Sequence, residues 1–383
     1  MKRVLIDISS LVNELRHKRP PHGIPRVTLA YLNHYKDSIQ VLIRGGKWVF
    51  ILSHEKSKEI VNLLLAWDPR LFKPIMKLIL KGILFSRHTV PDTEYYLLKV
   101  DQGGFRNPRY IQALNNKKIK IIAVVHDLIP ILNPEYCTAH HTAKFSTGLS
   151  TILEHAKGII TVSEATRESL LRYVAHIGAF CPPTLTSTLA PGILATNHKT
   201  LPRIKGIYFI TVSTIGARKN HLLLLQIWRN MVNRYGNNVP TLVIVGKRSA
   251  TDEYALAMLD RCEELRDKVI DFSCTDDEMI NYLQHARALL FPSFTEGYGL
   301  PLIEALSLNV PVIASDLAVF REIAGDIPEY LDPLDGLGWM KCIEQYTLEN
   351  SALRNAQLQR MEGFRIPTWQ DHFSRVEAFV DAL

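Results

Sequence analysis

The feature that most constrains the fold of this chain is the alternation of short β-rich runs with segments of helical periodicity. Buried strands are predicted at residues 4–8, 119–125, 158–162, 208–213, 241–245, 288–291 and 310–314. Helical segments between them include residues 222–235, 276–286 and 301–308. Strands that alternate with helices form parallel sheets covered on both faces, so the chain is predicted to be an α/β protein.

The length predicts two domains. The chain has 383 residues, more than the roughly 250–300 at which one hydrophobic core usually divides. A polar stretch without periodicity, residues 192–206, is the predicted boundary. We therefore expect an N-terminal domain over residues 1–195 and a C-terminal domain over residues 206–365.

The last residues, 366–383, place four apolar side chains on one helical face. These are Trp369, Phe373, Val376 and Phe379. Such a face must pack on another part of the protein.

Composition narrows the class of protein. Hydrophobic residues make up 47% and charged residues 22%, as in ordinary globular proteins. The five cysteines are scattered and form no C-x-x-C pair, which argues against a disulfide framework or a zinc site and favours a reducing cytoplasm. Asp7 interrupts the first apolar run, so that run is predicted to be a strand rather than a signal peptide. No apolar run reaches the ~18 residues of a membrane-spanning helix.

The net charge of +7 fits an anionic substrate, an anionic membrane surface or a nucleic acid. The basic residues are spread along the chain and form no recognised nucleic-acid-binding motif, so no nucleic-acid partner is expected.

The strongest motif is FPSFTEGYGLPLIEAL, residues 291–306. A strand ends near Phe291, a glycine-containing loop carries Glu296, and Pro301 suits the first turn of a helix that carries Glu304. Free N–H groups at such a helix start attract an anion such as a diphosphate. The alternative, a Gly/Pro turn with two surface carboxylates, explains the pattern less well.

A second strand–loop–helix motif is TVSTIGARKNHLLLL, residues 211–225. Arg218 and Lys219 precede its helix and are suited to neutralise phosphate oxygens. Alone, a basic pair at a helix start is usually only solvated.

Two weaker motifs lie in the first half. VVHDLIP, residues 124–130, places His126 and Asp127 at the carboxyl end of a strand, where ligands bind in open α/β sheets. HGIPRVTLAYL, residues 22–32, contains Gly23, which permits close approach of the backbone to a ligand. A structural His126 and an ordinary loop at Gly23 remain the alternatives.

Together these segments resemble the retaining GT-B glycosyltransferases often called family 4, also known as glycosyl transferases group 1. EGYGLPLIEAL and GARKN carry the resemblance, and PSFTEGYGLPLIEALSLNVPVIASD continues it. GIPRV, VVHDLIPILNPE and ITVSEATRESL add weaker similarity, and residues 40–100 resemble the family least.

The resemblance implies two facing Rossmann-like domains with the donor held mainly by the second, and a final helix that crosses back to the first. Arg218 and Lys219 would hold the diphosphate, Glu296 the hydroxyls of the donor sugar, and Glu304 the ribose. The backbone around Tyr298, Gly299 and Leu300 would complete the phosphate site. From the first domain, His126 would reach the transferred sugar and Gly23 the diphosphate.

The resemblance also implies a retaining reaction that requires no metal, and the sequence contains no D-x-D pair. The acidic run TDDE, residues 275–278, is predicted to be the first turn of a helix rather than a metal site. The motif forms are similar to bacterial polysaccharide mannosyltransferases, which favours GDP-mannose as donor and a surface polysaccharide such as lipopolysaccharide O-antigen as product. A GT-B sugar-nucleotide 2-epimerase and a non-catalytic glycan-binding GT-B subunit are the alternatives.

Residues 69–88 form an apolar segment with lysines at positions 73, 77 and 81. This pattern fits a helix that lies on an anionic membrane surface, with Pro74 in its first turn. A core helix whose lysines extend to solvent fits equally well. In the first case, a lipid-linked glycan acceptor and a peripheral location on the cytoplasmic face of the inner membrane follow.

Overall fold

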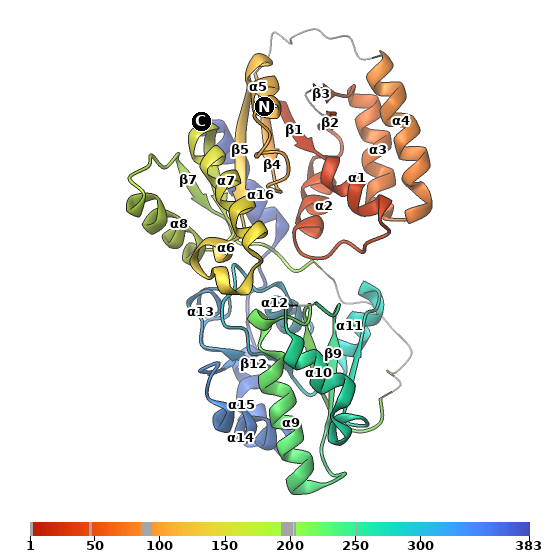
Figure 1. Ribbon diagram of the computed structural model, residues 1–383, viewed down its shortest axis with the longest axis vertical. Helices are drawn as coiled ribbons and strands as arrows, with labels where there is room; N and C mark the ends of the chain where they lie inside the picture. Colours follow the sequence, from red (N-terminus) through yellow and green to blue (C-terminus); the bar gives the residue numbers. More distant parts are fainter. Residues whose placement is uncertain (1–2, 46–47, 86–93, 193–201, 203, 250) are drawn as a thin grey trace. The chain divides into compact units, whose positions relative to one another are not determined.

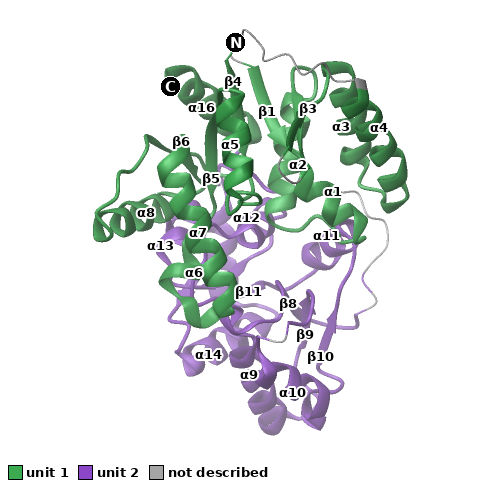
Figure 2. Cartoon of the chain, turned by 45° about the horizontal axis from the view of Figure 1, so that its top comes forward, with its two compact units in different colours: residues 1–189, 368–383 green, residues 190–367 purple. Residues whose placement is uncertain are grey.

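The computed structural model describes residues 3–45, 48–85, 94–192, 202, 204–249 and 251–383. The chain divides into two compact units (Figure 2): unit 1 is residues 1–189 with 368–383, and unit 2 is residues 190–367. The segment 192–206, predicted as the boundary, falls largely outside the described residues.

Unit 1 is built on a seven-stranded sheet, counted over the described residues, with the order β3-β2-β1-β4-β5-β6-β7. Its strands are β1 (Arg3–Asp7), β2 (Gln40–Gly45), β3 (Trp48–Ile51), β4 (Tyr95–Lys99), β5 (Ile119–Val125), β6 (Ala156–Thr161) and β7 (Thr184–Thr186). Its helices are α1 (Ser9–Arg16), α2 (Ile24–Tyr35), α3 (His54–Ala66), α4 (Phe72–Phe85), α5 (Pro108–Asn116), α6 (Ile129–Leu132), α7 (Ala139–His155), α8 (Glu164–His176) and α16 (Trp369–Ala382).

The sheet of unit 1 is parallel except at one edge. β3 pairs antiparallel with β2, because only a two-residue connection separates these strands and a parallel crossover needs a dozen or more residues. The expectation of parallel sheets is therefore confirmed, and β3 is an antiparallel edge strand that the sequence analysis did not predict.

Unit 2 has a six-stranded parallel sheet over the described residues, with the order β10-β9-β8-β11-β12-β13. The strands are β8 (Tyr208–Val212), β9 (Thr241–Val245), β10 (Val269–Phe272), β11 (Leu289–Phe291), β12 (Val312–Ser315) and β13 (Glu329–Leu331). The helices are α9 (His221–Tyr235), α10 (Glu253–Arg261), α11 (Asp276–Gln284), α12 (Leu300–Ser307), α13 (Ala318–Ala324), α14 (Gly336–Thr347) and α15 (Ala352–Met361). The acidic run is confirmed as the start of α11, where Thr275 and Glu278 form a capping box.

Each unit has its own apolar core. In unit 2, the side chains of Trp228, Trp339 and Tyr346 are fully buried among strand residues such as Phe209 and Ile313. In unit 1, strands β4 and β5 fill the centre of the sheet with Leu97, Ile121 and similar residues.

The C-terminal helix α16 belongs to unit 1, although the chain reaches it from unit 2. Its buried His372 shares hydrogen bonds with the hydroxyls of Tyr31, at 2.8 Å, and Ser187, at 3.0 Å. Burial lowers the pKa of His372 to about 4, so the ring is neutral at pH 7. Phe373 stacks on His34 with centroids 3.9 Å apart. The predicted apolar face is confirmed as a packing surface, with His372 as an additional buried member.

Helix α4 starts at Phe72, so Pro74 lies in its first turn as predicted. α3 and α4 run side by side in Figure 1. The buried side of α4 carries Ile75 and Ile79, and the lysines at 73, 77 and 81 are exposed. Residues 86–88, the end of the predicted segment, lie outside the described residues. Within the part of the chain that is described, no helix is both long and apolar enough to cross a membrane.

Candidate functional site

Two loops meet at the carboxyl edge of the sheet of unit 2. β8 and β11 are neighbours in the sheet and run parallel, so the loops that follow them leave from the same edge. One loop leads to the short 3₁₀ helix Ala217–Lys219 and the other carries Glu296. The backbone N–H of Phe294 donates to the carbonyl of Arg218 at 2.9 Å and holds the two loops together.

At this edge Glu296 is paired with both cations of the basic motif. Nη1 of Arg218 lies 2.7 Å from Oε2 of Glu296, and Nζ of Lys219 donates to Oε1. Arg218 also donates to the carbonyl of Thr295 at 2.6 Å. The Glu296 side chain is only 8% exposed, against 26% for Arg218 and 16% for Lys219. The sequence prediction that these three residues act at one place is thus consistent with their geometry.

The electrostatics of the cluster favour a charged carboxylate. Burial alone raises the pKa of Glu296, but the charges and hydrogen bonds of Lys219 and Arg218 outweigh it and lower the pKa to about 2. At neutral pH the cluster therefore contains one carboxylate and two cations. The three side chains together thus carry a net positive charge, which suits the binding of an anion.

The start of α12 lies directly after Glu296. Gly299 precedes the helix with φ of +119°, a conformation that side chains rarely adopt. A Cβ atom there would also lie 2.8 Å from Cε1 of Phe320. Only glycine fits, and it leaves the first N–H groups of the helix without a side-chain cap from that position. Leu300 begins α12, and Tyr298 and Glu304 are buried on either side of this start.

His221, the first residue of α9, is buried next to the basic pair. Its Nε2 lies 3.2 Å from Oγ of Ser213. Burial, and then the charge of Lys219, lower its pKa to about 4. The ring is therefore neutral and adds no third positive charge to the cluster.

Arg248, in the loop after β9, is held in ion pairs away from this cluster. Its Nε lies 2.8 Å from Oδ2 of Asp271 and its Nη1 lies 2.6 Å from Oδ1 of Asp260. These contacts give Arg248 a structural role.

The remaining predicted residues, His126 and Gly23, belong to unit 1. His126 follows β5 directly and its Nε2 lies 2.8 Å from the carbonyl of Val100. Since a carbonyl only accepts, Nε2 carries the proton and Nδ1 is left as the acceptor. Burial is the main cause that lowers the pKa of His126. Gly23 caps α2 with φ of +60°, and a Cβ atom there would meet nothing within 4 Å. Its backbone is thus exposed, as close approach to a ligand requires.

The sequence analysis missed two buried hydroxyls beside the glutamate loop. Ser293 follows β11, Ser315 ends β12, and both are fully buried. Neither Oγ has a hydrogen-bond partner among the described residues. A buried polar group without a partner is uncommon. Both hydroxyls are therefore candidates for a polar contact at the carboxyl edge of the sheet. A small polar residue at the end of an apolar run is the signal that identifies them.

The described residues contain no group of three or more His, Cys, Asp or Glu side chains placed to hold a metal ion.

Comparison with known proteins finds similarity to glycosyltransferases. Residues 196–327 match the family model described as glycosyl transferases group 1. The serotype-specific mannosyltransferase WbdA of Escherichia coli is 31% identical over 219 residues, which cover 52% of this chain and 26% of WbdA. The O-antigen chain mannosyltransferase RfbU of Salmonella typhimurium is 26% identical over 254 residues, which cover 62% of this chain and 67% of RfbU. The chain thus spans about a quarter of the length of WbdA.

Solved structures agree on the fold. Anabaena HepE in complex with UDP and glucose superposes with a TM-score of 0.69 over the full length of both chains, at 13% identity. The lipopolysaccharide outer core galactosyltransferase WaaB superposes with a TM-score of 0.58, also over the full length of both chains. The two Rossmann-like units are therefore those of the GT-B fold, and residues 196–327 are similar to the glycosyl transferases group 1 family.

Proposed function

We propose that this protein is a retaining glycosyltransferase that moves a sugar, with mannose favoured, from a nucleoside diphosphate donor to a growing surface polysaccharide. The observation that carries the proposal is the cluster of Arg218, Lys219 and Glu296 beside the start of α12. Two cations, a helix start and a buried carboxylate provide partners for both halves of a nucleotide sugar.

Each part of the cluster has a role in this proposal. Arg218 and Lys219 bind the diphosphate, together with the backbone N–H groups of residues 298–300. Glu296 accepts hydrogen bonds from the donor sugar, and Glu304 from the ribose. In unit 1, Nδ1 of His126 accepts from a hydroxyl of the transferred sugar, and the bare backbone at Gly23 approaches the diphosphate.

The ion pairs of Glu296 suit a site that alternates between empty and loaded states. Without a donor, the carboxylate offsets the charges of Arg218 and Lys219. When a diphosphate binds, these cations gain a second anionic partner, and Glu296 becomes available to the sugar hydroxyls. This exchange avoids leaving two partly buried cations unpaired at any stage.

The proposed chemistry is attack of the acceptor hydroxyl on the same face of the sugar that the diphosphate leaves. Negative charge develops on the leaving diphosphate and is stabilised by Arg218, Lys219 and the helix start. The departing phosphate oxygen takes the proton of the acceptor hydroxyl. No metal ion is needed, because the two cations supply the positive charge that a divalent ion otherwise provides.

Similarity to O-antigen mannosyltransferases supports GDP-mannose as the donor and a lipid-linked glycan as the acceptor. Such an acceptor is extended on the cytoplasmic face of the inner membrane, which gives the proposed location.

The exposed side of α4 supports contact with an anionic membrane. Lysines at 73, 77 and 81 share that side with Leu80 and Leu84, whose exposed fractions are 56% and 79%. Lysines beside large exposed apolar side chains are typical of helices that lie in a membrane interface. The buried side of α4, with Ile75 and Ile79, attaches the helix to unit 1.

The proposal is tested by thermal unfolding of the protein with GDP, UDP, dTDP and ADP, each with EDTA. A ligand that binds the folded state raises the melting temperature by mass action. We expect stabilisation by one nucleotide, GDP first, in the absence of metal. No shift with any nucleotide contradicts a donor site and favours a non-catalytic glycan-binding subunit. A sugar-nucleotide 2-epimerase also binds nucleotides but transfers no sugar, so product analysis separates it.

A further inference from the structure

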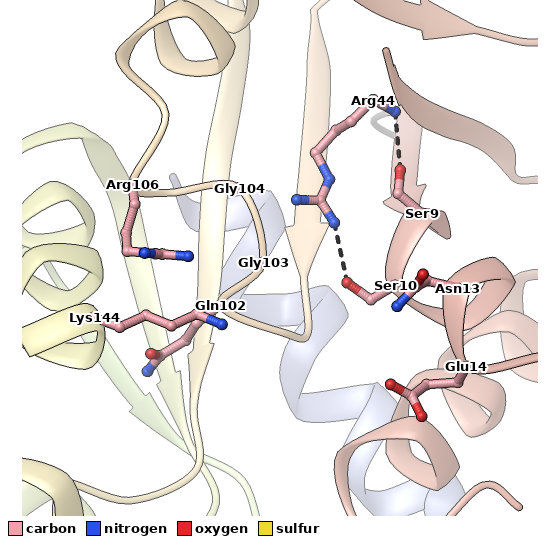
Figure 3. Close-up of a pocket in the computed structure, with 10 residues that line it drawn as sticks. All are labelled: Ser9, Ser10, Asn13, Glu14, Arg44, Gln102, Gly103, Gly104, Arg106 and Lys144. Atoms are coloured by element: carbon pink, nitrogen blue, oxygen red, sulfur yellow. Dashed lines mark hydrogen bonds between the residues drawn. The ribbon is translucent and has the colours of Figure 1, made fainter. Parts of the chain in front are cut away.

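Unit 1 contains a pocket of about 310 Å³ that the proposed donor site does not use. It lies at the carboxyl ends of β2, β1 and β4, which are consecutive in the sheet. Figure 3 shows Ser10, Asn13 and Glu14 of α1 on one side and Gln102, Arg106 and Lys144 on the other. Arg44 and the loop of Gly103 and Gly104 lie between them. Ligands of open α/β sheets bind at this edge.

A buried charge network adjoins the pocket through Arg44, which lines it. The side chains of Asp7 and Lys99 are both fully buried, and Oδ2 of Asp7 lies 3.1 Å from Nζ of Lys99 and 2.8 Å from Nε of Arg44. Lys99 also pairs with Asp101 at 2.8 Å. Burial raises the pKa of Asp7, but Lys99 and Arg44 outweigh it and lower the pKa overall. Buried charges of this kind seldom add net stability, so their role is more readily explained by the groups that they orient.

The group oriented by this network is Arg44. Asp7 fixes its Nε, while its Nη2 donates to Oγ of Ser10 at 3.0 Å. The backbone of Gly103 and Gly104 approaches this guanidinium closely. A Cβ atom at Gly103 would lie 2.9 Å from Nη2, and one at Gly104 would lie 2.7 Å from Nη1. Gly104 also has φ of +97°, which favours glycine, and a side chain at Gly103 would displace the neighbouring polar side chains.

The charges that line the pocket leave a positive excess. Of the lining residues, Arg44 is matched by the buried Asp7, and Glu14 is matched by Arg19 at 3.4 Å. Within the described part of the chain, no ion pair engages the exposed side chains of Arg106 and Lys144. Amide and hydroxyl groups of Asn13, Gln102 and Ser9 fill the remainder of the lining.

We propose that this pocket binds a carbohydrate that carries an anionic group, a phosphate or a carboxylate. Arg106 and Lys144 pair with the anion, while Asn13, Gln102 and the serines bind the sugar hydroxyls. Resting on the glycosyltransferase proposal, we assign this ligand to the acceptor, so that the acceptor is recognised through an anionic sugar unit. The volume lies at the lower end of the roughly 300–1,000 Å³ of small-molecule pockets, which fits one sugar unit rather than an oligosaccharide.

Calorimetric titration with four probes tests the proposal: mannose 1-phosphate, methyl glucuronide, methyl mannoside and inorganic phosphate. Mannose 1-phosphate or methyl glucuronide should bind about tenfold more tightly than neutral methyl mannoside, because a charge-assisted contact is gained. Arg106→Gln and Lys144→Gln should each weaken the charged sugar about tenfold. Arg109→Gln, an exposed arginine near Arg106 but outside the pocket, is the matched control and should change nothing.

The Asn13→Ala variant distinguishes recognition of the sugar hydroxyls from recognition of the anionic group. Asn13 is exposed, so its loss should leave the fold intact and weaken the charged sugar about fivefold without affecting inorganic phosphate. Equal binding of phosphate and mannose 1-phosphate, with equal losses in the variants, overturns the carbohydrate assignment. Unchanged binding in Arg106→Gln and Lys144→Gln overturns the site itself.

Two controls keep this test independent of the donor site. The titrations are repeated in the Lys219→Ala variant, since mannose 1-phosphate has a phosphate that the donor site also binds. Arg106→Gln should leave nucleoside diphosphate affinity unchanged. If no nucleotide binds the protein but the charged sugar does, the donor proposal fails and the pocket stands. If nucleotides bind but the charged sugars do not, the pocket proposal alone fails.

Discussion

Nη1 of Arg218 lies 2.7 Å from Oε2 of Glu296, and Lys219 shares the other oxygen of the same carboxylate. Lys219 and Glu296 are 77 residues apart in the sequence and meet because β8 and β11 are adjacent parallel strands. In the proposed function, the carboxylate and an incoming diphosphate share the same two cations. Substitution of a cation and substitution of the carboxylate are therefore expected to have opposite effects on nucleotide binding.

Replacing Lys219 with Ala should weaken nucleoside diphosphate binding about tenfold, since a charge-assisted contact with the phosphate is lost. Titration calorimetry of GDP without metal measures the effect. Lys268, whose Nζ donates to the carbonyl of Asn237 in the same unit, provides the control Lys268→Ala. Equal affinities of Lys219→Ala and wild type would remove Lys219 from the diphosphate site.

Replacing Glu296 with Gln should leave nucleoside diphosphate affinity unchanged or tighten it, because the two cations lose their competing carboxylate. Sugar transfer should fall about a hundredfold, since the contact with the sugar hydroxyls is lost where charge develops. Measuring GDP affinity and kcat on the same preparation tests both. A loss of nucleotide affinity as large as that of Lys219→Ala would contradict the proposed division of roles.

Stability should depend on pH through Glu296. Its pKa is lowered from 4.5 in the unfolded chain to about 2 in the fold. The contribution, about 3 kcal/mol at most, is fully present above pH 4.5 and is lost as the pH falls toward 2. The difference in unfolding free energy between wild type and Glu296→Gln should therefore shrink over that interval. A difference that stays constant from pH 6 to pH 2.5 would mean that the carboxylate is not paired in solution.

Replacing Gly299 with Ala should destabilise the start of α12 in two ways: through the φ of +119° and through the approach to Phe320. We expect a loss of about 2–3 kcal/mol in unfolding free energy. Gly236 is the control, because its φ of +59° carries strain while a Cβ atom there meets nothing within 4 Å. Denaturant unfolding of Gly236→Ala should show only the loss from backbone strain, about 1–2 kcal/mol. Equal losses at both positions would remove the packing argument.

Charge reversal on α4 tests membrane contact. Lys77→Glu with Lys81→Glu should reduce binding to vesicles that contain anionic lipid by about tenfold or more at low salt, because each basic residue near the surface contributes about 1 kcal/mol. Both side chains are exposed, so the fold should be unaffected. Vesicle sedimentation measures the effect, with Lys117→Glu and Lys118→Glu, which lie outside α4, as control. Undiminished binding by the α4 variant would favour the alternative of a core helix with solvated lysines.

Strands and candidate site residues could be predicted from the sequence where a short continuous segment contains the whole pattern. The predicted strands at β5 and β9 agree with the structure to the residue, because each is a short, mainly apolar run rich in β-branched residues. The loops with Arg218 and Glu296 were identified for a similar reason: each follows a strand directly and opens a helix. Their contact needed only the inference that parallel strands end at one edge.

Features that depend on strand order were not predicted. Asp7, Arg44 and Lys99 meet because β2, β1 and β4 are consecutive in the sheet, an order that no local pattern encodes. The antiparallel strand β3 was not predicted. It has only four residues, and a helix follows it, as a helix follows the parallel strands, so nothing in its local sequence distinguishes its direction. Ser293 and Ser315 were missed because a buried hydroxyl without a partner is recognised only after the neighbouring atoms are placed.

The most direct test of the account is proton NMR of GDP-mannose incubated with the protein and EDTA, with water as the acceptor. The account predicts slow release of mannose whose first detected anomer has the configuration of the donor, read before mutarotation equilibrates, and abolition of that release in Lys219→Ala. Release of the inverted anomer would contradict the retaining mechanism. Conversion of the sugar at C2 without net transfer would identify an epimerase instead.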